Sequence, residues 1–180
     1  ERYSDDSLLP AVILVSPSGD TLDLGQVDIS GKPLDAVMEV MGSVAESPIR
    51  RGLQEKLIKH WCVILFMPGT DEKRNAAALA GIKASAKAIA GKKTELNKSI
   101  DTAPLILTLD PKQPEEKIVL WSLGLAAPDG EEERPARALA LAGRGETRGP
   151  TLEGENVDRG KMSELLEMLG RSCSCTTSPV

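Results

Sequence analysis

Two cysteines near the C-terminus are the residues best suited to chemistry in this sequence. Cys173 and Cys175 are separated by one serine and stand in a polar stretch that we expect to be exposed. Two thiolates at this spacing can bind Cu(I), or share Zn(II) with a second chain of a homodimer so that four ligands are complete. They can also form a strained disulfide that is easily reduced. A plain structural or incidental disulfide is the favoured interpretation of the pair, and redox or soft-metal chemistry is the alternative.

The remaining candidates for chemistry favour structural roles. Cys62 lies inside the apolar run at residues 61–67, and a buried strand cysteine usually behaves as a small, unreactive hydrophobic residue. His60 is the single histidine, and the sequence has no Gly-x-Ser-x-Gly motif that would support a serine, histidine and aspartate triad. Met38 and Met41 fit a packed core better than a copper site. We therefore predict no catalytic residue among them.

Composition limits the classes of function. The 180 residues are 41% hydrophobic and 27% charged, which is typical of a folded chain with one main core. Aromatic residues make up 2% and the formal net charge is -5, so the stacking platforms and basic patches of nucleic-acid binders are missing. No apolar run approaches the roughly 20 residues of a membrane span. The first residue is not methionine, and we expect an exported protein, periplasmic or extracellular, with a cytoplasmic location as the alternative.

Residues 1–59 are expected to form an N-terminal extension packed on the core. Apolar residues at 11–15 precede a turn cluster, and residues 21–27 can return as the second strand of a hairpin. Two helices are predicted next, over residues 33–44 and 48–59. In the first of them Leu34, Val37, Met38 and Met41 recur at helical spacing, which indicates a buried face.

Residues 60–171 are expected to form the core, followed by a Cys-x-Cys tail at residues 172–180. The run at 61–67 predicts a central strand buried on both faces. Thr70 or Asp71 can cap the helix that follows it, which stops at Gly91. The later elements are predicted as a strand at 105–109, a short helix at 110–123, a strand at 136–142, its hairpin partner at 147–152 and a last helix at 157–169.

This order of elements resembles the thioredoxin fold, in which right-handed crossovers bring the early strands into parallel pairing. The local match is Arg134-Pro135 before the strand at 136–142, followed by the glycine-containing turn at 143–145 and the last helix. This segment is similar to the part of thioredoxins in which a cis-proline precedes a strand. The resemblance implies an α/β, thioredoxin-like fold with a mixed central sheet flanked by helices. It also implies a groove beside Arg134 and Pro135 and a cis bond before Pro135, with a trans proline that simply starts a strand as the alternative.

The active-site motif of the thioredoxin family is missing from the position where the family carries it. Thioredoxins place Cys-x-x-Cys at the start of the helix after the central strand, where the helix N-terminus lowers the pKa of a thiol. Here the segment at 67–73 reads Met-Pro-Gly-Thr-Asp-Glu-Lys and contains no cysteine. The chain also resembles exported bacterial thioredoxin-like proteins with a C-terminal Cys-x-Cys, which brings no activity with it. We expect a non-catalytic binding or scaffold domain for a protein partner, with the role of Cys173 and Cys175 in thiol redox or Cu/Zn binding as the alternative.

Overall fold

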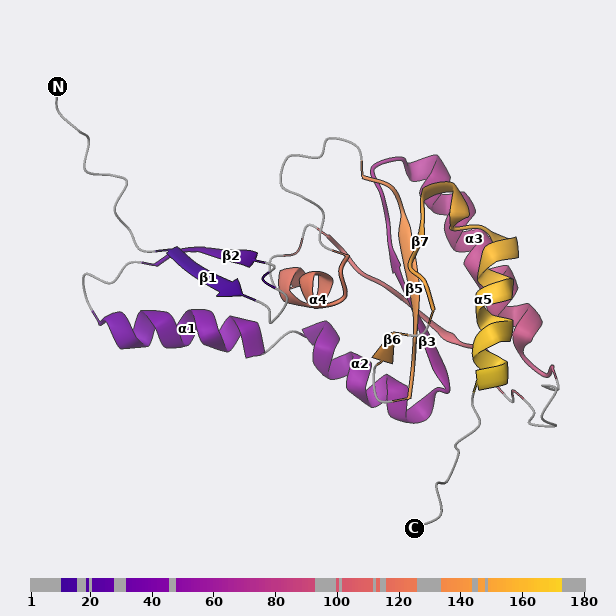
Figure 1. The fold of residues 1–180 in the computed structure, drawn as a ribbon, viewed down its shortest axis with the longest axis horizontal. Helices are drawn as coiled ribbons and strands as arrows, with labels where there is room; N and C mark the ends of the chain where they lie inside the picture. The colour runs from indigo at the N-terminus through magenta and orange to yellow at the C-terminus, as the bar shows by residue number, and fades with distance from the viewer. Residues whose placement is uncertain are drawn as a thin grey trace, which may run out of the picture.

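The computed structural model describes most of the chain and contains two separate sheets (Figure 1). The described residues are 11–15, 19, 21–27, 32–45, 48–92, 100, 102–111, 113, 116–125, 134–143, 146–147 and 149–172. The larger sheet has five strands and is flanked by helices, which confirms the predicted α/β class. No helix in this part of the chain is both long and apolar enough to cross a membrane.

The strand β3 (Cys62–Met67) lies at the centre of the large sheet. β4 (Leu105–Thr108) pairs with it in parallel, and β5 (Arg137–Ala142) pairs with its other edge in antiparallel orientation. β6 (Glu146–Thr147) and β7 (Leu152–Glu153) both pair with β5. All six residues of β3 are buried, as expected for an unbroken apolar strand that is covered on both faces.

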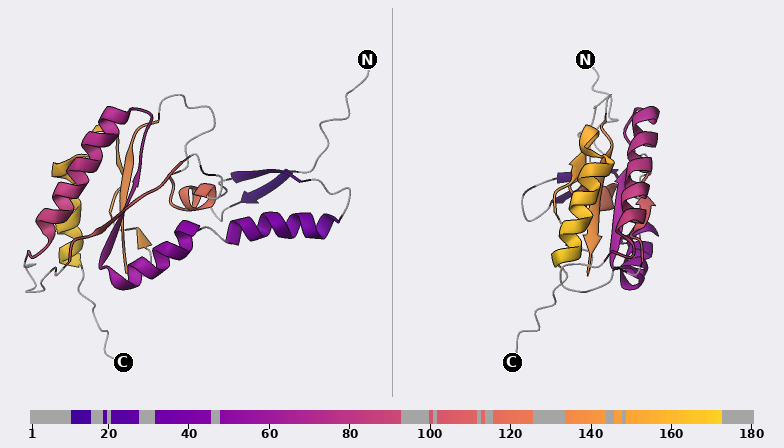
Figure 2. Two further views of the ribbon diagram at one scale, coloured as in Figure 1. Left: turned by 180° about the vertical axis from the view of Figure 1, so that it is seen from behind. Right: turned by 90° about the vertical axis from the view of Figure 1, so that its right-hand side faces the viewer.

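Helices cover both faces of this sheet. α3 (Glu72–Ile89) and α5 (Arg159–Ser172) lie on one face, whereas α2 (Pro48–Lys59) and α4 (Lys117–Ser122) lie on the other (Figures 1 and 2). Because side chains alternate along a strand, β3 supplies both halves of the core. Every second residue, beginning at Cys62, belongs to the apolar cluster under α3 and α5, and the others belong to the cluster that contains residues of α2 and α4.

The contact between α3 and α5 depends on small residues. A Cβ atom added to Gly81 would lie 3.0 Å from the backbone nitrogen of Arg159, so glycine allows the start of α5 to approach α3 closely. Ser85 is buried, and its hydroxyl group donates to the carbonyl oxygen of Arg159 at 2.8 Å. The hydroxyl of Ser163 donates in turn to Ser85 Oγ at 3.0 Å. These bonds satisfy a buried hydroxyl that would otherwise destabilise the core.

The first strands and helix lie to one side of the large sheet, beyond α4 (Figure 1). β1 (Ala11–Val15) and β2 (Thr21–Gln26) form an antiparallel hairpin, and α1 (Pro33–Ala45) follows them. The apolar stripe of α1 is not buried, since the exposed fractions of Met38 and Met41 are 61% and 45%. The prediction that these methionines belong to the core is wrong. A two-stranded hairpin offers too little surface to cover a helix, and the large sheet already has helices on both faces.

Two other predicted elements differ in length. The helix predicted from residue 110 begins at Lys117. Before it, Gln113 N–H donates to Asp110 O and Glu116 N–H donates to Gln113 O, which are the three-residue hydrogen bonds of turns. The hairpin strand predicted at 147–152 is divided into β6 and β7. Pro150 stands between them, and its nitrogen has no hydrogen to donate to the ladder of the sheet.

Candidate functional site

A cleft of about 480 Å³ opens where β3 ends and α3 begins. The loop after β3 and the first turn of α3 form one wall, the segment that leads into β5 forms the other, and Gly154 after β7 completes the lining. Both Arg134 and Pro135 line this cleft. The position follows from the topology, because β5 runs antiparallel to β3, so the end of one strand lies beside the start of the other.

Asn75 holds the loop after β3 in place. Its Oδ1 atom accepts a hydrogen bond from Gly69 N–H at 2.7 Å, and its Nδ2 atom donates to the carbonyl oxygen of Gly69 at 2.8 Å. Asn75 is half-buried, and its side chain, which projects from α3, forms hydrogen bonds with both the N–H and the carbonyl group of Gly69. The loop is therefore fixed to the helix that follows it.

The same loop is pressed against the segment before β5. Thr70 N–H donates to the carbonyl oxygen of Arg134 at 2.9 Å. A Cβ atom added to Gly69 would collide with that carbonyl oxygen and would lie 2.6 Å from the backbone nitrogen of Ala136. Only glycine fits this close approach of two backbones. The two walls of the cleft are thus joined at its floor by backbone contacts.

The peptide bond before Pro135 is trans, so the cis bond implied by the thioredoxin resemblance is wrong. The trans form is the intrinsically favoured one for an X-Pro bond, by about 0.5–1 kcal/mol. In this geometry the carbonyl oxygen of Arg134 points to Thr70 N–H and accepts its hydrogen bond. The partner predicted for the groove beside Pro135 stays a prediction.

Two arginines and one aspartate supply the charged groups of the cleft. Arg74 lies in the first turn of α3, and Arg134 precedes β5 from the opposite wall. Asp71 is the N-cap of α3, as predicted, and its carboxylate accepts hydrogen bonds from Lys73 N–H at 2.9 Å and Arg74 N–H at 3.1 Å. The second oxygen of Asp71 lies 3.5 Å from Arg74 Nε. A carboxylate of the chain itself therefore already occupies the N-terminus of this helix.

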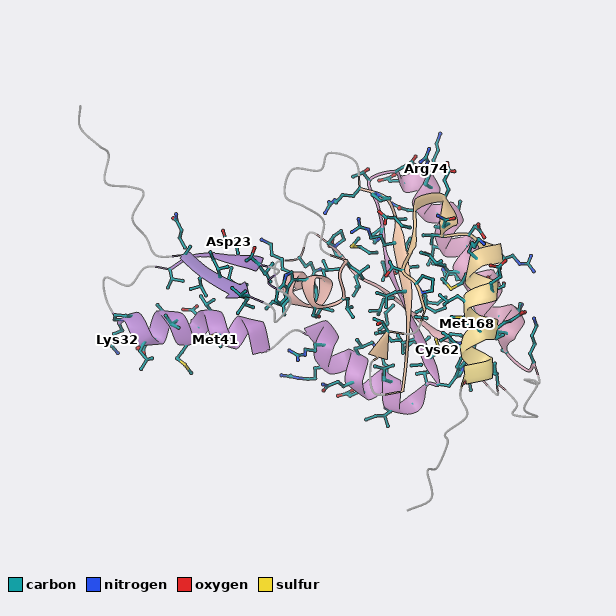
Figure 3. All side chains as sticks on the ribbon, in the orientation of Figure 1. Asp23, Lys32, Met41, Cys62, Arg74 and Met168 are labelled. Carbon is teal, nitrogen blue, oxygen red and sulfur yellow. The ribbon has the colours of Figure 1, made fainter. Side chains whose placement is uncertain are left out.

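None of the described residues that line the cleft carries a sulfur atom. Cys62 is completely buried at the opposite end of β3, about 16 Å away at roughly 3.3 Å per residue, and Figure 3 shows it far from Arg74. Cys173 and Cys175 lie outside the described residues, so the thiol and metal predictions for them stay predictions. Among the residues that the structure describes, no three His, Cys, Asp or Glu side chains gather in a way that could hold a metal ion.

His60 lies at the same end of the large sheet as Cys62, directly before β3. Its backbone N–H donates to the carbonyl oxygen of Lys56, which ends α2. Its Nδ1 atom is buried and has no hydrogen-bond partner among the described residues. The residue is therefore remote from the cleft, and no acid or second histidine of the described part of the chain joins it to form a metal site.

Sequence reasoning named Arg134 and Pro135 as residues of a groove but missed the opposite wall. Asn75 was one signal, since a short polar side chain in the first turn of an Ala-rich helix favours hydrogen bonds to nearby backbone groups. Its partner Gly69 follows a proline, which by itself indicates only a turn. No family model matches the chain, and no match is found among curated proteins or solved structures.

Proposed function

We propose that this chain is a thioredoxin-like domain without dithiol chemistry that binds a segment of another protein in the cleft lined by Gly69, Thr70, Arg134 and Pro135. The observation that carries the proposal is the cleft itself, which lies after β3 where the family would carry its cysteines, and none of the described residues that line it has a thiol. A domain that keeps this surface and lacks the nucleophile is suited to binding rather than to disulfide exchange.

The pairing of the strands supports the thioredoxin-like interpretation. The resemblance predicted parallel early strands followed by a hairpin and a last helix. β3 and β4 are parallel, β5 is antiparallel to β3, the strands after β5 return beside it, and α5 ends the described chain. α3 and α5 share one face of the sheet while α4 lies on the other.

The chemistry of the lining supports binding over catalysis. The polar residues described in the lining are two arginines, an asparagine, a threonine and the aspartate that caps α3. No histidine or cysteine is among the described residues of the lining, so none of them pairs a thiol nucleophile with an imidazole base. The volume of about 480 Å³ is within the range that holds a small ligand or a few side chains of a peptide. Because its floor is fixed by backbone hydrogen bonds, little ordering free energy would be lost on binding.

The proposal can be tested with peptides selected from a random phage-displayed library on the full chain. Binding would be mapped by changes in ¹⁵N-¹H spectra, which we expect at Gly69, Thr70 and Ala136. Thr70→Phe would fill the cleft from an exposed position and should abolish binding. Thr102→Phe is the matched control, since Thr102 is also exposed and precedes β4 at the opposite end of the sheet.

Two results would contradict the proposal. The first is a set of selected peptides that bind Thr70→Phe as well as the unmodified chain, because the binding surface would then lie elsewhere. The second is measurable reduction of insulin disulfides by the full chain, because the domain would then be a dithiol enzyme despite the missing motif.

A further inference from the structure

We infer that the segment held in the cleft is anchored through a carboxylate bound between Arg74 and Arg134. This inference rests on the proposed function of the same cleft and adds the chemistry of its partner. The carboxylate can be the side chain of an aspartate or glutamate, or the free C-terminus of the partner.

The charges that line the cleft are unequal. Arg74 and Arg134 approach the cavity from different elements, α3 and the segment before β5. Asp71 is the single acid among the described residues of the lining; its Oδ1 atom already accepts from two backbone N–H groups, and its Oδ2 atom lies near Arg74 Nε. In the described part of the chain no carboxylate forms an ion pair with Arg134, whose residue is half-buried. Among the described residues of the lining, the arginines therefore exceed the acids by one.

The hydrogen-bond donors of the cleft also favour an anion bound by guanidinium groups. The backbone N–H of Gly69 is used by Asn75, and that of Thr70 is used by the carbonyl oxygen of Arg134. The first turn of α3 is capped by Asp71, so the end of the helix is not the binding group. The guanidinium groups of Arg74 and Arg134 are the charged donors that remain. A guanidinium group presents two parallel N–H bonds whose spacing matches the two oxygens of a carboxylate.

Binding of three short peptides can be compared to test whether the cleft prefers a side-chain carboxylate, a C-terminal carboxylate or a neutral amide. They are Gly-Glu-Gly with both ends blocked, its Gly-Gln-Gly counterpart with both ends blocked, and N-acetylated Gly-Gly-Gly with a free C-terminus. Each would be titrated into the full chain and followed by ¹⁵N-¹H spectra at low salt. We expect at least one carboxylate peptide to bind about fivefold or more tightly than Gly-Gln-Gly, and we expect added salt to weaken it.

Variants then test the two arginines. Arg134→Gln and, separately, Arg74→Gln should reduce the binding of the carboxylate peptide toward that of Gly-Gln-Gly. Lys83→Gln is the matched control, because Lys83 is an exposed cation of α3 outside the cleft lining and its loss should change nothing. Thermal unfolding of each variant shows whether it is folded, and the two arginine variants provide independent tests.

The outcomes distinguish this inference from the proposed function. Equal binding of all three peptides at the cleft overturns the inference and leaves a neutral binding site intact. A carboxylate preference that survives both arginine substitutions also overturns it, as does the absence of any spectral change at the cleft with either carboxylate peptide. The phage-selected peptides decide the proposed function separately, since that selection does not depend on charge.

Discussion

The backbone N–H of Thr70 donates a hydrogen bond to the carbonyl oxygen of Arg134 across 2.9 Å. The last residue pair of the ladder between β3 and β5 is Met67 and Arg137. The bond from Thr70 to Arg134 therefore joins the same two segments of the chain again, beyond the end of the sheet. The two peptide planes approach closely enough that the residue before Thr70 must be glycine. The shape of the cleft is thus determined by backbone contacts, and its charge is determined by the side chains around them.

Gly69→Ala is expected to destabilise the protein. The added methyl group would collide with the carbonyl oxygen of Arg134, and a backbone atom cannot move aside as a flexible side chain can. Overpacking of this kind typically lowers the free energy of unfolding by about 1–3 kcal/mol. Urea unfolding of the variant and the unmodified chain would measure the difference.

Gly52→Ala is the matched control for that substitution. Gly52 lies inside α2, where an added Cβ atom would meet only Lys56 Nζ at 3.7 Å. Alanine is favoured over glycine within a helix by up to about 1 kcal/mol, so this variant should be as stable as the unmodified chain or more stable. Equal stability of the two alanine variants would contradict the close contact at Gly69.

Asn75→Ala is expected to release the loop at the floor of the cleft. The substitution removes both hydrogen bonds to Gly69 and leaves its N–H and carbonyl groups without these partners. The free energy of unfolding should fall by about 1–3 kcal/mol, and hydrogen exchange at the Gly69 amide should become faster. Asn156→Ala removes an exposed asparagine beyond β7 and should leave both quantities unchanged. Unchanged exchange at Gly69 in Asn75→Ala would show that the loop does not depend on this side chain.

The sequence predicted the elements that have a strong local signal. The apolar run at 61–67 contains β3, and the cap of α3 is Asp71, one of the two residues predicted for that role. The burial of α1 was predicted wrongly for a physical reason. Helical spacing of Leu34, Met38 and Met41 identifies an apolar face, but periodicity carries no information about whether another element covers it.

The candidate site could be predicted only in part. Pro135 marked one wall because a proline before a strand is visible in the sequence. The opposite wall depends on contacts between residues that are distant in sequence, such as the hydrogen bond from Thr70 to Arg134. The same bond depends on how the peptide before Pro135 is oriented, and the sequence does not determine the isomer of an X-Pro bond.

Because the apolar side chains of α1 are exposed, we expect substitutions of Met38 in α1 and Leu53 in α2 to have different effects on the free energy of unfolding. Met38→Ser should change the free energy of unfolding by no more than about 0.5 kcal/mol, because 61% of Met38 is exposed. Leu53→Ala in α2 should lower it by about 2 kcal/mol or more, because Leu53 belongs to the apolar cluster under β3. Urea unfolding of both variants would test this. A large loss in Met38→Ser would show that the α1 stripe is covered in solution.

Zinc binding by the C-terminal cysteines would have a characteristic stoichiometry. A structural zinc site needs four ligands, and Cys173 and Cys175 of one chain supply two, so the same pair from a second chain would complete the site. We therefore expect any bound Zn(II) to appear in native mass spectra as one ion per two chains, and only in dimers. The Cys173→Ser, Cys175→Ser double variant should lose both the zinc and the dimer. It retains Cys62, which is fully buried and should stay unmodified by iodoacetamide until the chain unfolds. Stoichiometric zinc on a monomer, or zinc retained by the double variant, would place the ligands elsewhere in the chain.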